Sequence, residues 1–148
     1  MKYEERKQDL FTLGDDYYLA HCISADFAMG KGIAVEFARR GVKRELERLF
    51  PGYVNHYHHY RINGDCRLID QVFNLITKER YFEKPTYESL ENALLSLKHK
   101  CDWHQVKKLA MPKIGCGLDG LLWETVSRMI QDIFEDTDIE ILVCYLED

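Results

Sequence analysis

Short apolar runs of strand length alternate along this chain with segments of helical periodicity, and no other feature restricts the fold as strongly. Three such runs lie in the second half, at residues 71–77 (QVFNLIT), 106–112 (VKKLAMP, ending at Pro112) and 139–146 (IEILVCYL). Segments with helical spacing separate them. Strands that alternate with helices predict an α/β fold, with a mixed, largely parallel sheet covered by helices on both faces.

Three segments are expected to form helices. The first covers residues 32–40 (GIAVEFARR), where Ile33 and Phe37 are four residues apart. The second follows Thr86, a residue type suited to capping, and has its apolar positions at Leu90, Ala93, Leu94, Leu97 and Cys101. The third covers residues 121–136, with apolar positions at Trp123, Val126, Ile130, Ile133 and Phe134. Each apolar stripe predicts one face packed against the sheet.

The first half of the chain predicts further strands. Residues 2–7 (KYEERK) alternate, and residues 17–22 (YYLAHC) combine aromatic and apolar side chains. Residues 54–60 (VNHYHHY) also alternate, and the Asn63-Gly64 pair that follows is a strong hairpin signal, with residues 71–77 as the returning strand. No internal repeat or boundary interrupts the 148 residues, so a single domain over residues 1–148 is expected.

Charge and cysteine usage exclude several classes of protein. The net charge is −5, and basic residues are mixed with acidic ones, which argues against broad binding to long nucleic acids. The five cysteines show no paired spacing, which predicts reduced thiols rather than a disulfide framework or a zinc site. Residues 1–11 have no apolar core like that of a secretory signal, and no run of about 18 apolar residues follows. We therefore expect a cytosolic protein without a membrane segment.

Two glycine-containing loops occupy the places where ligands bind in such sheets, beyond the carboxyl ends of the strands. Residues 29–32 (MGKG) precede the first predicted helix, and residues 113–120 (KIGCGLDG) precede the helix near Leu122. Each loop is expected to point backbone N–H groups and the positive end of a helix dipole at a ligand, which suits phosphate. Neither matches GxxxxGK[ST] or GxGxxG, so a nucleoside triphosphatase or an ordinary dinucleotide-binding enzyme is not indicated.

Lys78 and Asp119 each have an ordinary and a functional interpretation. Lys78 follows an apolar strand, where a lysine is usually solvated, and Asp119 ends the second glycine loop, where an aspartate commonly supports a turn or caps a helix. In the functional interpretation, desolvation lowers the pKa of Lys78 until a neutral amine can act as a nucleophile. Asp119 then moves protons for it. Residue spacing alone leaves both interpretations open.

Other polar residues also have two interpretations. Ser24 follows a strand and is placed to donate a hydrogen bond to a ligand, although a turn serine is equally ordinary. Cys116 lies between two glycines, a position that resembles that of a nucleophile, but no partner base can be assigned, so its small size is the simpler explanation. The histidines in NHYHHY suggest a metal site, yet no carboxylate or cysteine lies at suitable spacing, so a strand face is expected there. These are His56, His58 and His59.

Taken together, several blocks of sequence resemble the macrodomain family, within the branch that contains the terminal ADP-ribose protein glycohydrolase. The resemblance covers nearly the whole chain in order, and LITK with MPKIGCGLD is its most specific part. The blocks are QDLF (8–11), LAHCIS (19–24), MGKGIAVEF (29–37), LITKER (75–80), KPTYESL (84–90), MPKIGCGLDGLLWE (111–124) and FEDTDIEILVCYL (134–146). Residues 41–60 are not diagnostic, so their part in substrate choice is open.

The resemblance implies a three-layer α/β/α domain with a cleft for ADP-ribose, and it assigns roles to residues. Lys78 and Asp119 match the catalytic pair. Asp9 matches the acceptor for the adenine amino group, with Leu10 and Leu146 beside the adenine, and Ser24 lines the cleft. One phosphate-facing loop is matched by Gly30, Gly32, Ile33 and Ala34, and the other by Ile114, Gly115, Cys116, Gly117 and Leu118.

The implied activity is hydrolysis of ADP-ribose esters on protein carboxylates through a covalent lysine intermediate, without a metal or another cofactor. O-acetyl-ADP-ribose and ADP-ribosylated nucleobases are further implied substrates. The expected partners are ADP-ribose and mono-ADP-ribosylated protein or nucleic acid, and the expected form is a cytosolic monomer, with a nuclear location open if the source is eukaryotic. Two alternatives use the same cleft: a reader that binds ADP-ribose without cleaving it, and an ADP-ribose 1″-phosphate phosphatase. A third alternative is a nucleotide-binding protein of unrelated purpose.

Overall fold

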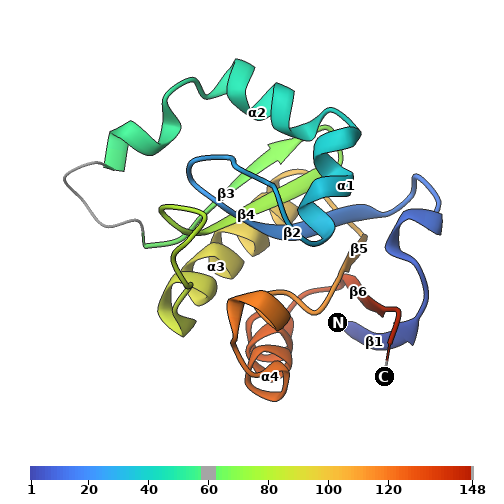
Figure 1. Cartoon of the computed structure of the whole chain (residues 1–148). Coiled ribbons are helices and arrows are strands. Elements are labelled where there is room, and N and C mark those ends of the chain that lie inside the picture. The colour runs from blue at the N-terminus through green and yellow to red at the C-terminus, as the bar shows by residue number, and fades with distance from the viewer. Residues whose placement is uncertain (58–62, 148) are drawn as a thin grey trace.

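The computed structural model describes residues 1–57 and 63–147, which form one six-stranded sheet with helices on both sides (Figure 1). The strands are β1 (Lys2–Lys7), β2 (Tyr18–Ser24), β3 (Asp65–Ile69), β4 (Val72–Lys78), β5 (Lys108–Met111) and β6 (Glu140–Tyr145). The helices are α1 (Ile33–Arg39), α2 (Val42–Leu49), α3 (Tyr87–Trp103) and α4 (Trp123–Phe134). Short 3₁₀ helices span Leu10–Thr12, Tyr53–Tyr57 and Gly117–Asp119.

The sheet is mixed and largely parallel, as the alternation of strands and helices predicts. Its strand order is β1-β6-β5-β2-β4-β3. The β3 and β4 strands pair antiparallel, and the other neighbours pair parallel. Every parallel connection needs a crossover on one face, which puts helices over both faces.

Two hydrophobic cores lie on opposite faces of the sheet and confirm the three-layer α/β/α architecture. One joins apolar side chains of α3 and α4 to the sheet, such as Leu94 and Ile130. The other joins α1 and α2 to the opposite face, through side chains such as Phe37 and Leu46. In Figure 1, α1 and α2 lie on one side of the strands, and α3 and α4 lie on the other.

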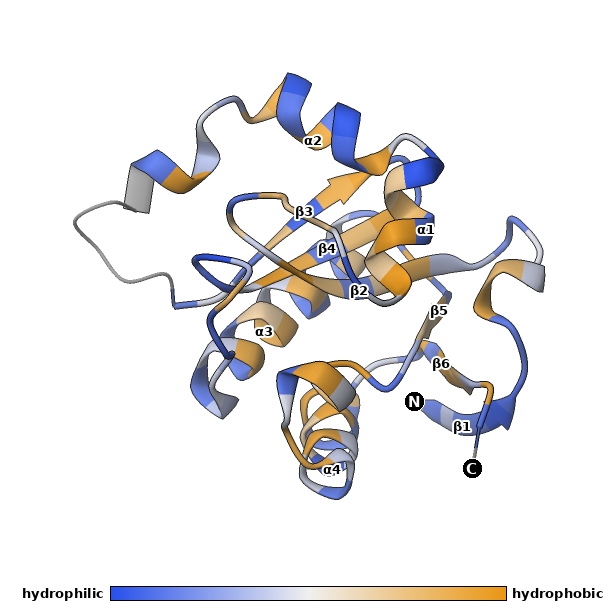
Figure 2. Cartoon of the chain, viewed as in Figure 1, coloured by the Kyte–Doolittle hydropathy of each residue, from blue (hydrophilic) through white to orange (hydrophobic). Residues whose placement is uncertain are grey.

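The central strands and the edge strand differ in burial, and their compositions differ accordingly. The five inner residues of β4 are all buried, because helices cover both sides of it. Among the described strands, β1 pairs only with β6, and it is exposed along most of its length. Charged side chains protect such an edge from pairing with another chain, and Figure 2 shows β1 as predominantly hydrophilic.

The predicted hairpin at Asn63-Gly64 is wrong. Residues 53–57 form a 3₁₀ helix rather than a strand, and residues 58–62 lie outside the described part of the chain. The β4 strand does leave a hairpin, but its partner is β3 and its turn lies at Asp70-Gln71, where Asp70 has a φ of 51°. Gly64 packs against α3 instead, since a Cβ there would lie 2.2 Å from the carbonyl oxygen of Ser89. The glycine therefore serves close packing rather than a turn.

Helix α2 has no counterpart among the sequence predictions, which end the first helix at residue 40. Gly41 separates α1 from α2 and has a φ of 93°. Val42 and Leu46 are buried four residues apart, and charged residues fill the outer face of α2. This spacing is a helical signal that could have been found in the sequence.

Helix α3 is fixed at its start by a reciprocal cap, as Thr86 predicts. The Thr86 hydroxyl accepts from the Ser89 backbone N–H, and the Ser89 hydroxyl accepts from that of Thr86, both at 3.0 Å. The cap satisfies two N–H groups that otherwise lack partners in a helix. Among the described residues, no helix is both long and apolar enough to cross a membrane.

Candidate active site

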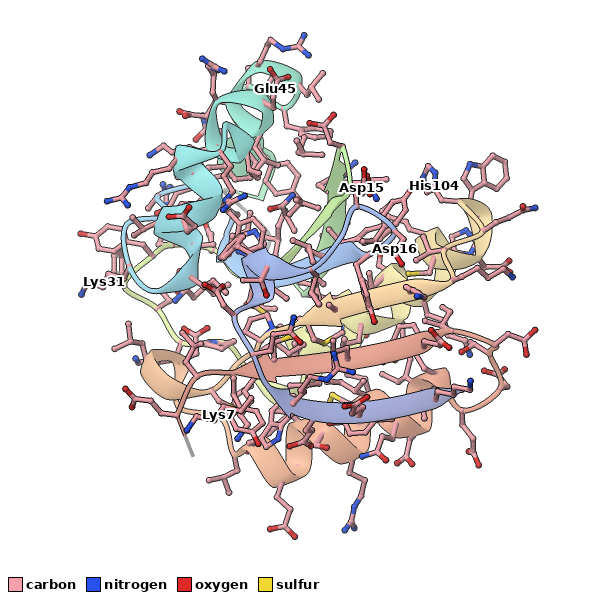
Figure 3. The ribbon with its side chains drawn as sticks, turned by 90° about the vertical axis from the view of Figure 1, so that its right-hand side faces the viewer. Lys7, Asp15, Asp16, Lys31, Glu45 and His104 are labelled. Carbon is pink, nitrogen blue, oxygen red and sulfur yellow. The ribbon has the colours of Figure 1, made fainter. Side chains whose placement is uncertain are left out.

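The carboxyl ends of five parallel strands meet at one edge of the sheet, and the predicted site residues lie on or just beyond it. There β2 ends at Ser24, β4 at Lys78, β5 at Met111 and β6 at Tyr145. Figure 3 shows Lys7 and Lys31 at this edge, whereas Asp15, Asp16 and His104 lie toward the opposite edge. We refer to the two as the carboxyl edge and the amino edge. Ligands in open α/β sheets bind at the carboxyl edge.

Lys78 and Asp119 form an ion pair at the carboxyl edge. The Lys78 Nζ donates to Asp119 Oδ1 at 2.9 Å, across 41 residues of sequence. Their side chains are 15% and 19% exposed, so the pair is largely shielded but still reached from solvent. Lys78 is the last residue of β4, and Asp119 ends the 3₁₀ helix of the glycine loop. The structure thus brings together the two residues that the sequence nominated as catalytic.

The loop of residues 113–120 turns sharply between β5 and α4. Gly115, Gly117 and Gly120 all have positive φ, at 73°, 68° and 81°. A Cβ on Gly117 would meet no atom within 4 Å, so the backbone there is open on that side. The helix that follows begins at Trp123, close to its predicted start near Leu122. Because of these glycines, the backbone next to Asp119 is not covered by side chains of the loop.

The other glycine loop, residues 25–32, stores backbone strain. Phe27 and Met29 have positive φ, at 54° and 47°, although both are bulky residues. Both side chains are buried, which holds them in that conformation. Gly32 has φ 61° and ψ −150°, a region open essentially only to glycine, and α1 begins at the next residue. Strain of this kind clusters at ligand sites, where packing maintains a backbone shape that the chain does not prefer.

Asp26 organises this loop, and the sequence reading did not identify it. Its Oδ1 accepts from the Ser24 hydroxyl at 2.6 Å and from the Ala28 backbone N–H at 3.2 Å. Its Oδ2 accepts from the backbone N–H of Tyr81 at 3.0 Å. An aspartate that bonds the N–H two residues ahead makes a common turn, and its place just after β2 was the available signal. The Ser24 hydroxyl therefore has a protein partner in this structure.

The segment between β4 and α3 connects the two glycine loops. Besides the Tyr81–Asp26 bond, the Lys84 Nζ donates to the carbonyl oxygen of Leu118. The Tyr87 hydroxyl accepts from the Leu122 backbone N–H at 3.0 Å. The segment that follows Lys78 thus bonds to both glycine loops.

The residues expected near adenine also lie at the carboxyl edge. Asp9 and Leu10 follow β1, and Leu146 follows β6, the strand that pairs with β1. Asp9 Oδ1 caps the first 3₁₀ helix by accepting from the Phe11 backbone N–H at 2.9 Å. Leu10 is buried, whereas Leu146 is exposed. Their adjacency matches the expectation, and their role toward adenine stays a prediction.

Two cysteines close to the ion pair are poor nucleophiles. Burial raises the pKa of the Cys22 thiol to about 12, and the Asp119 carboxylate adds to that effect. Burial also raises the pKa of Cys116. A thiol with a raised pKa stays protonated at neutral pH, and the thiolate is the reactive form. These pKa directions favour the interpretation of Cys116 as a small residue that fits between two glycines.

A buried histidine lies in β2 beneath α1. The His21 ring stacks on Phe37, with ring centroids 4.0 Å apart, and its Nε2 is 2.6 Å from Asn74 Oδ1. Asn74 Nδ2 donates to two backbone carbonyls, so its Oδ1 accepts and His21 Nε2 carries the hydrogen. Burial lowers the pKa of His21 to about 4, and His21 is accordingly neutral at pH 7.

Of the three histidines in NHYHHY, His56 is the one within the described residues. His56 lies in the 3₁₀ helix rather than on a strand, and His58 and His59 fall outside the described residues. Within residues 1–57 and 63–147, no group of three or more His, Cys, Asp or Glu side chains is arranged to hold a metal ion.

A hollow of about 760 Å³ lies at the amino edge, beside the end of α3 and the start of β6, away from the predicted site residues.

Comparisons with known proteins agree with this geometry. The family model described as "Macro domain" matches residues 20–130. A human protein named ADP-ribose glycohydrolase OARD1 is 42% identical over 141 residues, covering 93% of this chain and 87% of that protein. A DNA ADP-ribosyl glycohydrolase of Thermus aquaticus is 26% identical over 126 residues, covering 79% of this chain and 34% of that protein. The macrodomain of Mycobacterium tuberculosis DarG superposes with a TM-score of 0.81 at 20% identity, covering 96% of each chain.

Proposed function

The chain belongs to the macro domain family, and from that premise we propose that it hydrolyses ADP-ribose adducts. The proposed substrates are esters between a protein carboxylate and the anomeric carbon C1″ of the distal ribose. O-acetyl-ADP-ribose and ADP-ribosylated nucleobases carry the same reacting carbon and are proposed as secondary substrates. The similarity to the human protein supports this choice, because that protein is named an ADP-ribose glycohydrolase and matches over most of both chains.

The ion pair of Lys78 and Asp119 is the observation that carries the proposal. A module that only binds ADP-ribose needs glycine loops and a place for adenine, but it has no use for a shielded lysine and aspartate 2.9 Å apart. A nucleophile whose proton can pass to a neighbouring base is the usual arrangement for covalent catalysis. The pair therefore favours an enzyme over a reader.

The first chemical stage joins Lys78 to the ribose. Asp119 takes a proton from the Lys78 ammonium, which frees the lone pair on Nζ. Nζ attacks C1″, and the bond from C1″ to the ester oxygen breaks as the protein carboxylate leaves with the electron pair. The new secondary ammonium passes a proton to the departing carboxylate. The protein side chain is then free, and ADP-ribose is bound to Lys78.

The second stage releases ADP-ribose. The Nζ lone pair forms a C=N bond to C1″ as the ring oxygen O4″ departs, and Asp119 returns its proton to O4″. Water adds to C1″ of this Schiff base and gives a proton back to Asp119. The C–N bond then breaks, the electron pair and a proton go to Nζ, and the released aldehyde closes again to ADP-ribose. No metal enters these steps, because the carboxylate is already a good leaving group, so EDTA is expected to leave the rate unchanged.

The two glycine loops are proposed to hold the diphosphate on either side of this chemistry. Gly30, Gly32, Ile33 and Ala34 form one binding segment, and Ile114 to Leu118 form the other. The N–H groups that begin a helix lack intrahelical acceptors and suit anions. Asp9, Leu10 and Leu146 are proposed at the adenine end. Binding energy from these remote parts of the ligand positions C1″ next to Nζ.

The direct test follows ADP-ribose release from a mono-ADP-ribosylated glutamate ester. The proposal expects release by the unmodified protein and loss of release in Lys78→Ala. ADP-ribose binding without release from any adduct would identify a reader instead. Faster removal of phosphate from ADP-ribose 1″-phosphate than of any carboxylate would identify a phosphatase. Full activity in Lys78→Ala would exclude the covalent mechanism.

A further inference from the structure

Two exposed aromatic side chains lie close in sequence to the proposed nucleophile. Tyr81 and Phe82 follow Lys78 by three and four residues, and they are 62% and 70% exposed. Their ring centroids are 5.4 Å apart, with an interplanar angle of 87°, so the two rings meet edge to face. Large aromatic surfaces in water are unfavourable unless a partner covers them, and they commonly mark contact sites.

The turn that carries these rings is fixed to the site. The Glu83 carboxylate accepts from the Arg80 backbone N–H at 2.7 Å, and the Glu83 N–H donates to the Arg80 carbonyl at 3.0 Å. The bond from the Tyr81 N–H to Asp26 joins the turn to one glycine loop, and the bond from Lys84 to Leu118 joins it to the other. The rings are therefore presented from a braced turn beside the ion pair.

Exposed apolar side chains also come from the facing glycine loop. Leu118 and Leu122 flank Asp119 in sequence, and both are about two-thirds exposed, at 66% and 67%. Lys84 and Tyr87 connect that loop to the aromatic turn. We call Tyr81, Phe82, Leu118 and Leu122 the apolar rim. The rim combines the turn that follows Lys78 with the segment that carries Asp119.

The charge around the rim discriminates between two kinds of partner. Residues 79–88 (ERYFEKPTYE) contain three glutamates against one arginine and one lysine, a net charge of −1. Proteins that stack aromatic rings on nucleic-acid bases combine them with a positive groove for the phosphates. This segment lacks such an excess of positive charge. A polypeptide, which has an uncharged backbone, fits an apolar rim of this charge.

We propose that the apolar rim binds the polypeptide that carries the ADP-ribosylated carboxylate, with Tyr81 and Phe82 contacting an apolar side chain next to the modified residue. This inference rests on the proposed function, because only a substrate held at Lys78 places its acceptor chain beside the rim. The consequence is selectivity among modified proteins. Esters flanked by apolar residues are cleaved faster than esters flanked by small polar ones, while a small adduct such as O-acetyl-ADP-ribose gains nothing from the rim.

The experiment measures kcat/KM for three substrates in a double variant that carries both Tyr81→Ser and Phe82→Ser. Its matched control is Trp103→Ser, which removes an aromatic ring that is 78% exposed at the end of α3. The substrates are an ester-linked ADP-ribosyl peptide with leucine flanks, the same peptide with serine flanks, and O-acetyl-ADP-ribose. We expect the double variant to lower kcat/KM about tenfold on the leucine-flanked peptide and to leave O-acetyl-ADP-ribose within about twofold. Trp103→Ser is expected to change neither.

With an ADP-ribosylated oligonucleotide as a fourth substrate, two outcomes would overturn the inference. An equal fall on O-acetyl-ADP-ribose would mean that the rings shape the cleft rather than contact the acceptor. A fall on an ADP-ribosylated oligonucleotide without a fall on the peptide would make the rim a nucleic-acid contact.

A binding measurement keeps the inference separate from the proposed function. In Lys78→Ala, which is expected not to turn over, the leucine-flanked ADP-ribosyl peptide should bind about tenfold more tightly than free ADP-ribose. This preference should vanish when Tyr81→Ser and Phe82→Ser are added. Equal affinities for peptide and ADP-ribose before the rim is altered would refute the inference, whether or not the unmodified protein shows turnover.

Discussion

Two lysine–aspartate ion pairs lie at opposite edges of the same sheet. They differ in burial rather than in the distance between nitrogen and oxygen. At the carboxyl edge, Lys78 and Asp119 are 2.9 Å apart, with side chains 15% and 19% exposed. At the amino edge, Lys108 and Asp16 are 3.0 Å apart, with side chains 40% and 59% exposed. Distance alone therefore cannot identify a catalytic pair.

The surroundings of the two pairs differ in the way that the proposed function requires. The hydrogen bond with Lys108 lowers the pKa of Asp16, and the hydrogen bond with Asp16 raises the pKa of Lys108, so each group stabilises the charge of the other in water. That pair is exposed, and its partners lie in the loop before β2 and at the start of β5. The Lys78 pair instead lies between two loops with strained or open backbone. The Lys78–Asp119 pair thus differs from the surface pair in two respects: its side chains are largely buried, and it lies next to backbone that glycine leaves uncovered.

The largest difference between the two ion pairs is expected when the lysine amine is removed and its positive charge is kept. Lys78→Arg retains a cation opposite Asp119 but presents a guanidinium, which is a poor nucleophile. We expect ADP-ribose release to fall about ten-thousandfold, with ADP-ribose affinity nearly unchanged. Lys108→Arg, the matched change at the amino edge, is expected to leave both the rate and the affinity unchanged. Steady-state release and calorimetric titration with ADP-ribose measure these effects.

The next largest difference is expected between substitutions of the two aspartates, Asp119 and Asp16. Asp119→Asn removes the proposed proton acceptor without changing side-chain size, and we expect kcat to fall about a thousandfold. Asp16→Asn removes the solvated partner of Lys108 and should not alter kcat. Similar rates for Asp119→Asn and the unmodified protein would show that the carboxylate only positions Lys78.

Burial also separates two histidines in their effect on stability. The folded pKa of His21 is about 4, below the ordinary value of 6.5, so the unfolded chain binds more protons between those values. Stability is therefore full above about pH 6.5 and falls by roughly 3 kcal/mol as the pH drops to 4. Urea unfolding across this range should show a flatter profile in His21→Gln. His104→Gln, a change at an exposed position of the amino edge, should keep the original profile.

Two glycines with similar φ angles give the smallest contrast. Gly32 (φ 61°) lies in the loop of residues 25–32, and Gly52 (φ 67°) lies after α2. Alanine at either position is strained, and we expect each variant to lose on the order of 1 kcal/mol of unfolding free energy. Only Gly32→Ala should also weaken ADP-ribose binding, about tenfold. Equal binding losses in both variants would point to a general loss of stability rather than a local change in the loop.

Local patterns in the sequence predicted most elements of the fold. Thr86 and the apolar spacing of residues 90–101 predicted α3, because a cap and an apolar stripe are properties of consecutive residues. The Asn63-Gly64 signal failed because the identity of a glycine does not reveal whether it forms a turn or, as here, allows close packing against α3. Register and close packing depend on distant partners, which a local pattern does not contain.

The site was predictable only in part, for the same reason. Lys78 and Asp119 are 41 residues apart, so residue spacing left their meeting open and the family resemblance supplied it. Two of the hydrogen bonds of Asp26 are local, to Ser24 and Ala28, and only the third depends on the distant turn after β4. A local turn aspartate is ordinary, so its link between the two segments could not be read from the sequence. The exposure of Tyr81 and Phe82 likewise follows from tertiary structure, since their residue types alone favour burial.

Trapping of the covalent intermediate tests the central claim most directly. Sodium borohydride added during turnover of an ester-linked substrate reduces a Schiff base to a stable amine, which peptide mass spectrometry then locates. The proposed function predicts a single adduct with the mass of reduced ADP-ribose on Lys78 and none on Lys108. Turnover without an adduct on Lys78, or an adduct on another residue of an active protein, would contradict it.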